Sequence, residues 1–363
     1  MTVFSVLLSA CSETEQDASL AAEDSRLSTP EAALISSNPF FSESPLYLNY
    51  PPFDQIENAH FLPAFLRGMA EQSAEIEAIA QQSEPATFAN TIIAMELSGQ
   101  LLNRTDSVFS AMSSAHTNDE IRALEQQLAP QLAAHDDSIM LNRELFARIS
   151  RLYEQREGLT LDAQSKRLLG EYYSDFVRAG AALFVEQQQR MKELNGQIAT
   201  LQTRYSQQIL SEMNDLAILV DSREELTGLD EALVAAAEAE ADERGRQGKF
   251  VIPLLNTSGQ PALASLQNRA VRETMHRTSL SRGNRGGEFD NRKLLVNILQ
   301  LRAERAQLLG FENHAHYILE DSTAQTVAAV NGRLAELAPP AVANAGREAA
   351  DLQQMIYDEG ADF

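Results

Sequence analysis

The sequence has a single cysteine, no tryptophan and no long apolar run. One cysteine among 363 residues, Cys11, excludes an internal disulfide and a zinc site built from several cysteines. No run of about eighteen consecutive apolar residues is present, so no transmembrane helix is predicted. Aromatic residues make up only 6% of the chain. This composition suits helices packed through Ala and Leu better than a β-sandwich.

Basic residues are a minority. The chain has 29 Lys and Arg against 52 Asp and Glu, for a formal net charge of -23. A protein that binds nucleic acid needs a basic face to displace counterions from phosphates. We therefore predict no nucleic-acid partner and a well-hydrated surface.

Familiar catalytic motifs are missing as well. The sequence contains no His-Glu-x-x-His and no G-x-S-x-G, and "RGNRGGEF" (282–289) lacks the Lys-Ser or Lys-Thr ending of a phosphate loop. We expect that segment to be a solvated loop between helices. The residues taken alone thus indicate no catalytic residue and no metal ligand, and any substrate-binding residue stays unknown.

Two Glu-x-x-His pairs leave one alternative open. Glu57 and His60, and likewise Glu273 and His276, each share one helical face. A di-iron helical bundle needs two such pairs together with further glutamates. The spacing arises easily by chance in a Glu-rich chain, however, and most of the chain separates the two pairs.

The N-terminus resembles a bacterial lipoprotein signal. "MTVFSVLLSAC" (1–11) is an apolar segment that ends in a lipobox-like Leu-Ser-Ala-Cys, which predicts lipidation of Cys11 and a lipid anchor. The expected location is the periplasmic side of the bacterial cell envelope. No Lys or Arg precedes the apolar part, and the alternative is an incidental cysteine in a cytoplasmic protein. Residues 12–37, rich in Ser, Ala and acid, predict a flexible linker, so the folded part should be 38–363.

Helical periodicity dominates the rest of the chain. Within 182–214, Met191, Leu194 and Ile198 belong to an apolar stripe with spacings of three and four residues. Pro339 and Pro340 should break or kink the last helix. The other predicted helices are 57–80, 87–113, 118–153, 161–180, 229–245, 261–281, 288–309, 313–320 and 325–357.

Two short segments read as strands. "AILVD" (217–221) and "FVIPLLN" (250–256) are apolar and rich in β-branched residues, and they predict a two-stranded ribbon with Pro253 at an edge. We expect the ribbon to brace the long helix and to position the helix that starts at Pro261. The predicted fold class is therefore all-α, elongated and multi-helical, with one small β ribbon.

Several segments together resemble a known family. In order and spacing they are similar to the N-terminal part of bacterial peptidyl-dipeptidases of the thimet oligopeptidase family, from residue 38 onward. The matching segments are "NPFFSESPLYLNYPPFDQIENAHFLPAFLRGM" (38–69), "SGQLLNRTDSVFSAMSSAHTNDEI" (98–121), "LNRELFARI" (141–149), "FVIPLLNTSGQPAL" with "LQNRAVRE" (250–273) and "LLGFENHAHYILEDSTAQT" (308–326).

The resemblance implies a helical wall of a deep channel in a zinc peptidase. In that family the two histidines of His-Glu-x-x-His and a downstream glutamate hold the zinc, which activates water and polarises the scissile carbonyl. The substrates are short peptides, from which a C-terminal dipeptide is released. The zinc motif belongs to a later part of such enzymes, so no ligand carries over to this chain. We expect zinc in the intact enzyme, a C-terminal catalytic half as partner, and no activity from this chain alone.

Two further interpretations stay open. Members of the family that resemble oligopeptidase A are endopeptidases, and no motif in this sequence indicates residues that would bind a free C-terminal carboxylate. The chain also fits a non-catalytic helical binding module. A lone fragment should expose apolar surface where its missing half would pack.

Overall fold

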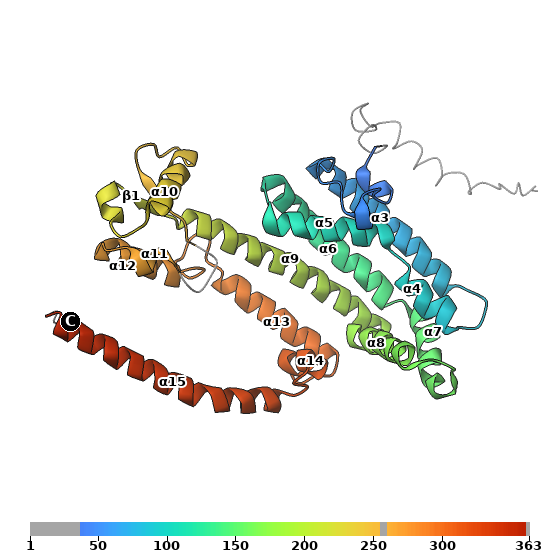
Figure 1. Ribbon diagram of the computed structural model, residues 1–363. Helices are drawn as coiled ribbons and strands as arrows, with labels where there is room; N and C mark the ends of the chain where they lie inside the picture. The colour runs from blue at the N-terminus through green and yellow to red at the C-terminus, as the bar shows by residue number, and fades with distance from the viewer. Residues whose placement is uncertain (1–36, 255–259, 361–363) are drawn as a thin grey trace, which may run out of the picture. The chain divides into compact units, whose positions relative to one another are not determined.

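The structure, a computed structural model, describes residues 37–254 and 260–360. The chain divides into two compact units, Met1–Ala181 and Ala182–Phe363. Helices make up most of both, and the one sheet within the described residues has two strands (Figure 1). The predicted all-α fold with a small ribbon is confirmed. Cys11, the predicted segment 1–11 and all but the last residue of the predicted linker 12–37 lie outside the described residues.

Within residues 37–181, unit 1 contains helices and no strand. Its 3₁₀ turns are η1 (Pro39–Phe41), η2 (Tyr47–Asn49) and η4 (Arg156–Gly158), and a π-helical turn, η3, spans Phe88–Ile93. Its α-helices are α3 (Asn58–Ala80), α4 (Ala94–Glu96), α5 (Gln100–Ala115), α6 (Asp119–Met140), α7 (Arg143–Glu154) and α8 (Ala163–Ala179).

Two apolar clusters hold unit 1 together. In the first, the ring of Phe109 on α5 meets Phe61 and Phe65 of α3 edge-on, with centroids 5.1 and 5.3 Å apart. The second cluster joins α7 and α8 around Ile149 and Phe176. Helices α3 and α5 approach closely at Gly68, where an added Cβ would lie 2.8 Å from the backbone nitrogen of Leu102. Such a contact leaves no room for a larger residue.

Three predicted helices are each interrupted. The segment 87–113 is broken before α5 by Gly99, whose φ of 69° is left-handed. The segment 118–153 is divided into α6 and α7, and Asn142 is the N-cap of α7. The segment 261–281 is divided in the same way, and Asn268 is the N-cap of its second helix. In each case the apolar periodicity continues on both sides of a short break, which is why the pattern predicted one long helix.

Unit 2 contains the ribbon and the longest helices. Its elements are α9 (Val185–Asp215), β1 (Ile218–Val220), the 3₁₀ turn η5 (Arg223–Leu226), α10 (Glu231–Glu243), β2 (Phe250–Ile252), α11 (Ala262–Ser265), α12 (Arg269–Leu280), α13 (Arg292–Leu308), α14 (His314–Glu320) and α15 (Val327–Asp358).

The predicted ribbon is present, though shorter than expected. Strands β1 and β2 are antiparallel, with Leu219 opposite Val251. The ribbon packs into a buried cluster with α10 and α12, which contribute Val234 and Met275. The chain before α12 is tied to the turn after η5, where the Gln267 amide donates to the Thr227 carbonyl over 2.8 Å. The ribbon thus braces α10 and α12, and it follows directly from the C-terminal end of α9.

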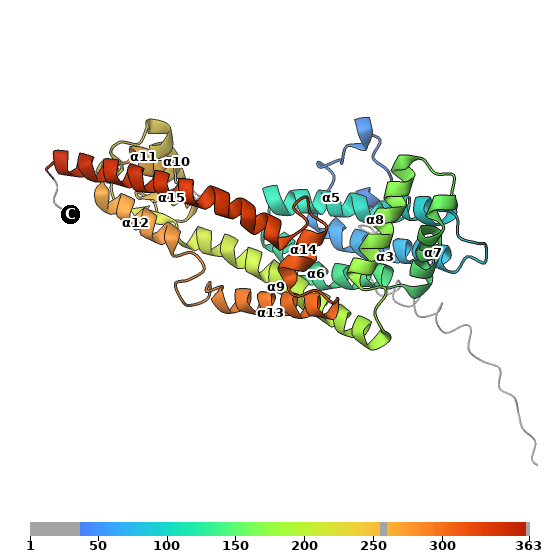
Figure 2. The ribbon, with the colours of Figure 1, turned by 90° about the horizontal axis from the view of Figure 1, so that it is seen from below.

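Helices α9 and α13 lie side by side (Figures 1 and 2). Met191, Leu194 and Ile198, from the predicted apolar stripe of α9, are all buried. At the edge of the contact, Nε and Nη2 of Arg190 donate to the two carboxylate oxygens of Glu304 over 2.7 and 3.0 Å. The stripe read from the sequence is therefore the packing face of α9.

Helix α15 contains no buried residue although it is 32 residues long; the short helices α11 and α14 also contain none. Helix α15 runs without interruption through Pro339 and Pro340, so of the predicted break or kink the break does not occur. Proline removes a helical hydrogen-bond donor, but on an exposed helix water can satisfy the carbonyls that lose their partner. Among the described helices, none is both long and apolar enough to span a membrane.

Candidate functional site

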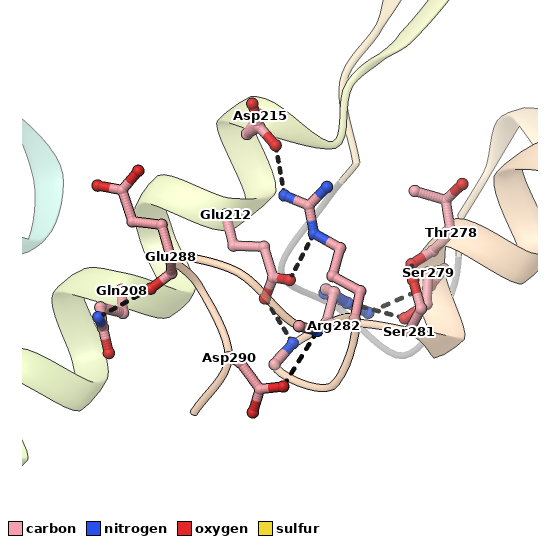
Figure 3. A network of polar contacts seen from close by, with 12 residues as sticks. Gln208, Glu212, Asp215, Thr278, Ser279, Ser281, Arg282, Glu288 and Asp290 are labelled. Carbon is pink, nitrogen blue, oxygen red and sulfur yellow. Dashed lines mark hydrogen bonds and ion pairs between the residues drawn. The ribbon is translucent and has the colours of Figure 1, made fainter. Parts of the chain in front are cut away.

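A polar network joins the C-terminal end of α9 to residues 281–291, here named the glycine-rich loop (Figure 3). At its centre is Glu212 of α9, which is 0% exposed. Its carboxylate accepts hydrogen bonds from the Gly283 backbone amide and from Nε of Arg285, the latter over 3.0 Å. A buried carboxylate needs such charge-assisted partners to offset the loss of its hydration.

Arg285 is held between two carboxylates of α9. Besides Glu212, its Nη2 pairs with Asp215, and its guanidinium lies 5.6 Å from the ring centroid of Phe289. The hydrogen bond to Asp215 and then that to Glu212 raise the pKa of Arg285 above its ordinary value. Arg285 therefore remains cationic and fastens the loop to the helix.

The remainder of the loop is also tied down. Asp290 accepts from the Gly286 amide over 3.0 Å and pairs with Arg292, whose hydrogen bonds lower the pKa of Asp290. Nε2 of Gln208 donates to the Glu288 carbonyl over 3.2 Å. Gly286 adopts a φ of 75°, a left-handed conformation that glycine takes at little cost.

The sequence contains one signal for this network, which is not part of any catalytic motif. Glu212 follows Tyr205 by seven residues, so it lies on the line of the apolar stripe of α9. A carboxylate at a core position of a helix indicates a buried ion pair. The prediction of a solvated loop holds for residues 284–288, which are exposed, but the loop is anchored rather than free.

The two Glu-x-x-His pairs serve local structure. The Glu57 amide donates to Nδ1 of His60 over 3.0 Å, as part of the N-terminal cap of α3. Glu273 pairs with Arg277 over 2.7 Å, and this hydrogen bond lowers the pKa of Glu273. The first pair belongs to unit 1 and the second to unit 2. The structure gives no support to the di-iron alternative.

Comparisons with known proteins give the chain its relatives. Residues 262–363 match Peptidase family M3. Over 330 residues the chain is 39% identical to the dipeptidyl carboxypeptidase of Escherichia coli K12. The aligned region covers 91% of this chain and 48% of that protein. Over 313 residues the chain is 30% identical to the oligopeptidase A of Escherichia coli K12, covering 85% and 46%. The chain spans about half the length of the curated relatives it matches.

The helical fold and these matches define a relative of the metallopeptidases. Residues 262–363 resemble Peptidase family M3, and over most of its length the chain is similar to the bacterial dipeptidyl carboxypeptidases, as the sequence resemblance predicted. Its identity to them, 39%, exceeds the 30% identity to the oligopeptidase A of Escherichia coli.

Family M3 is zinc-dependent in general, and the side chains described here do not fit a zinc ion. Within residues 37–254 and 260–360, no group of three or more His, Cys, Asp or Glu side chains is placed to hold a metal. The two acids at the centre of the network, Glu212 and Asp215, are already paired with Arg285. These two acids therefore have no role as zinc ligands.

Proposed function

We propose that the chain forms a helical, non-metal-binding part of a zinc peptidase that releases dipeptides from the C-terminus of short peptides. The observation that carries this proposal is the 39% identity over 330 residues to a dipeptidyl carboxypeptidase. The lower identity to oligopeptidase A, 30%, favours dipeptide release over internal cleavage. In this proposal the zinc ligands, and with them the bond-breaking step, come from another part of the enzyme.

The exposed face of α15 supports the proposal that another part of the enzyme supplies the catalytic residues. Leu334, Leu337 and Leu352 on this helix are all exposed to solvent. An isolated helix is marginal in water, and most helices in proteins are stabilised by packing an apolar face. We propose that this face packs against the catalytic part, whose apolar surface would stabilise α15 by about 25 cal/mol for each Å² buried.

An assay of the purified 363-residue chain tests whether it can bind zinc and cleave a peptide without the catalytic part. With zinc added, the chain alone should neither bind the metal stoichiometrically nor release a dipeptide from an N-blocked tetrapeptide. The product of the complete reading frame should release the dipeptide, and amidation of the peptide's C-terminus should block it. Stoichiometric zinc and dipeptide release by the chain alone would contradict the proposal. Internal cleavage of an amidated peptide would instead favour the endopeptidase alternative.

We also propose that Cys11 carries a lipid anchor and that residues 12–37 link it to the folded part in the bacterial cell envelope. The support is the lipobox-like Leu8-Ser9-Ala10-Cys11 and the Ser-, Ala- and acid-rich stretch that follows. The wild-type chain should partition into the detergent phase of a Triton X-114 extract, and Cys11→Ser should move it to the aqueous phase. Aqueous partition of both forms would favour the cytoplasmic alternative.

A further inference from the structure

Unit 1 contains a pocket that the proposed reaction does not use. The pocket has a volume of about 180 Å³ and lies between η1, the first turns of α5 and residues 42–56, here named the proline-rich loop. Prolines and aliphatic side chains form much of its wall, while one cation, Arg104, and one carboxylate, Glu43, also line it. The apolar wall residues include Pro51, Pro52, Ile56 and Val108.

Arg104 is oriented by the backbone. Its Nε donates to the Phe40 carbonyl over 2.9 Å, a bond between residues 64 positions apart. Within the described part of the chain, the Arg104 side chain makes no other hydrogen bond and no ion pair. A guanidinium has five N–H donors in a planar fork, so most of its donors remain for water or a ligand. This fork matches a carboxylate in two parallel hydrogen bonds.

Glu43 supplies the opposite charge. Its side chain is exposed at the pocket and forms no ion pair with any residue in 37–254 or 260–360. A purely anionic ligand would meet attraction from Arg104 and repulsion from Glu43. A ligand that carries both an ammonium and a carboxylate would satisfy both groups.

The proline-rich loop has a strained backbone and carries two exposed side chains that precede the pocket residue Asn49 in the sequence. Leu48 and Asn49 adopt left-handed φ values of 54° and 55°, and Asn49 itself lines the pocket. The Ser44 hydroxyl closes the loop by donating to the Tyr50 carbonyl over 2.6 Å. Tyr47 and Leu48 are 86% and 83% exposed. Left-handed conformations of bulky residues cost free energy, and they concentrate at functional sites.

We propose that this pocket binds a zwitterion of amino-acid or dipeptide size, with the carboxylate on Arg104 and the ammonium on Glu43. The apolar wall of the pocket, which includes Pro51, Pro52 and Ile56, then contacts the apolar side chain of the ligand. Recognition of a zwitterion follows from the pocket alone. That a dipeptide is the natural ligand rests on the proposed function, because a dipeptide is the product of that reaction.

Isothermal titration calorimetry on the 363-residue chain tests the proposal, with the dipeptide Ala-Leu as the probe. Acetylating its amino group or amidating its carboxylate should each weaken binding about tenfold or more, because each change removes one charged partner. Arg104→Lys should weaken Ala-Leu binding by a similar factor, since lysine keeps the charge but loses the fork.

Glu43→Gln provides the more specific test, because Glu43 is exposed and its replacement should leave the fold unchanged. It should weaken binding of Ala-Leu but leave binding of N-acetyl-Ala-Leu unchanged. Arg167→Lys, at an exposed arginine of α8, is the matched control and should change neither affinity. Melting temperatures of all variants separate a loss of binding from a loss of fold.

No binding of Ala-Leu at millimolar concentration, or equal binding of its capped forms, would overturn the proposal. So would a Glu43→Gln variant with wild-type affinity for Ala-Leu. If free leucine binds as tightly as Ala-Leu, the site recognises zwitterions in general. The dipeptide product is then not its specific ligand. Failure of the peptidase assay, in turn, would leave these affinities unchanged, so the two proposals fail independently.

Discussion

Helices α9 and α15 are almost equal in length, with 31 and 32 residues, yet their surroundings are opposite. Helix α9 buries an apolar stripe, packs beside α13 and receives the glycine-rich loop at its C-terminal end. Helix α15 contacts its neighbour α14 and buries none of its residues. The comparison teaches that a strong helical pattern predicts a helix but does not say which surface will cover it.

The largest expected effect lies on the buried face of α9. Leu194 is 0% exposed, and Leu194→Ala should lower the free energy of unfolding by about 2–5 kcal/mol. Leu334 of α15 is 56% exposed, and Leu334→Ala should change that free energy by less than about 0.5 kcal/mol. Urea denaturation of both variants measures the difference. Equal losses would show that α15 is packed in the isolated chain.

A close approach in the ribbon region should produce the next effect. Gly228 has a φ of 100°, and a Cβ added there would lie 2.0 Å from the Ser265 carbonyl oxygen. Gly228→Ala should therefore cost about 1–3 kcal/mol of stability, because it forces the backbone apart near α11. Gly245→Ala is the matched control, since Gly245 also has a positive φ, 69°, but has open space around it. Similar losses in both would assign the effect to φ alone.

The buried end of α9 should be sensitive to the loss of one charge. Glu212→Gln leaves Arg285 with Asp215 alone and places an amide where the Gly283 and Arg285 donors converge. We expect a loss of about 2 kcal/mol in the free energy of unfolding. Glu288→Gln, on an exposed residue of the same loop, should lose less than about 0.5 kcal/mol. A Glu212→Gln variant with wild-type stability would show that the network does not hold the loop.

The smallest expected effect is a gain in stability rather than a loss, and it depends on pH. Desolvation by burial, followed by repulsion from Asp106, raises the pKa of Asp136. A carboxyl whose folded pKa is raised destabilises the fold at pH values above that pKa, where it is ionised. Asp136→Asn should therefore raise the melting temperature at pH 7 by on the order of 1 °C.

That gain should shrink as the pH falls through the ordinary Asp pKa of about 3.9, because protonation then removes the charge in both the folded and the unfolded state. Asp106→Asn removes the repulsive partner, so the double variant should gain less than the sum of the two single variants. Thermal melts at pH 7 and pH 3.5 test both statements. A gain that persists at the lower pH would rule out the charge as its cause.

Much of the fold was predictable because it is local. The stripe through Met191, Leu194 and Ile198 predicted α9, and two β-branched segments predicted the ribbon. The breaks at Gly99, Asn142 and Asn268 were missed because apolar periodicity continues across them. These breaks depend on single capping residues, a weaker signal than a stripe.

The candidate sites were harder to predict because they depend on contacts between distant residues. Glu212 meets Gly283 across 71 positions, and Arg104 meets the Phe40 carbonyl across 64. Neither pairing is visible in a local pattern. A carboxylate on an apolar stripe was the one available signal for the first, and nothing in the sequence singled out the second.

The reading frame beyond codon 363 tests the central claim most directly. If the chain is a helical part of an M3 peptidase, the source DNA should continue in frame into a His-Glu-x-x-His helix followed by a downstream glutamate. That part would supply the zinc site and a surface for the exposed face of α15. A stop codon directly after Phe363, with no such motif encoded nearby, would contradict the peptidase account and favour a helical binding module.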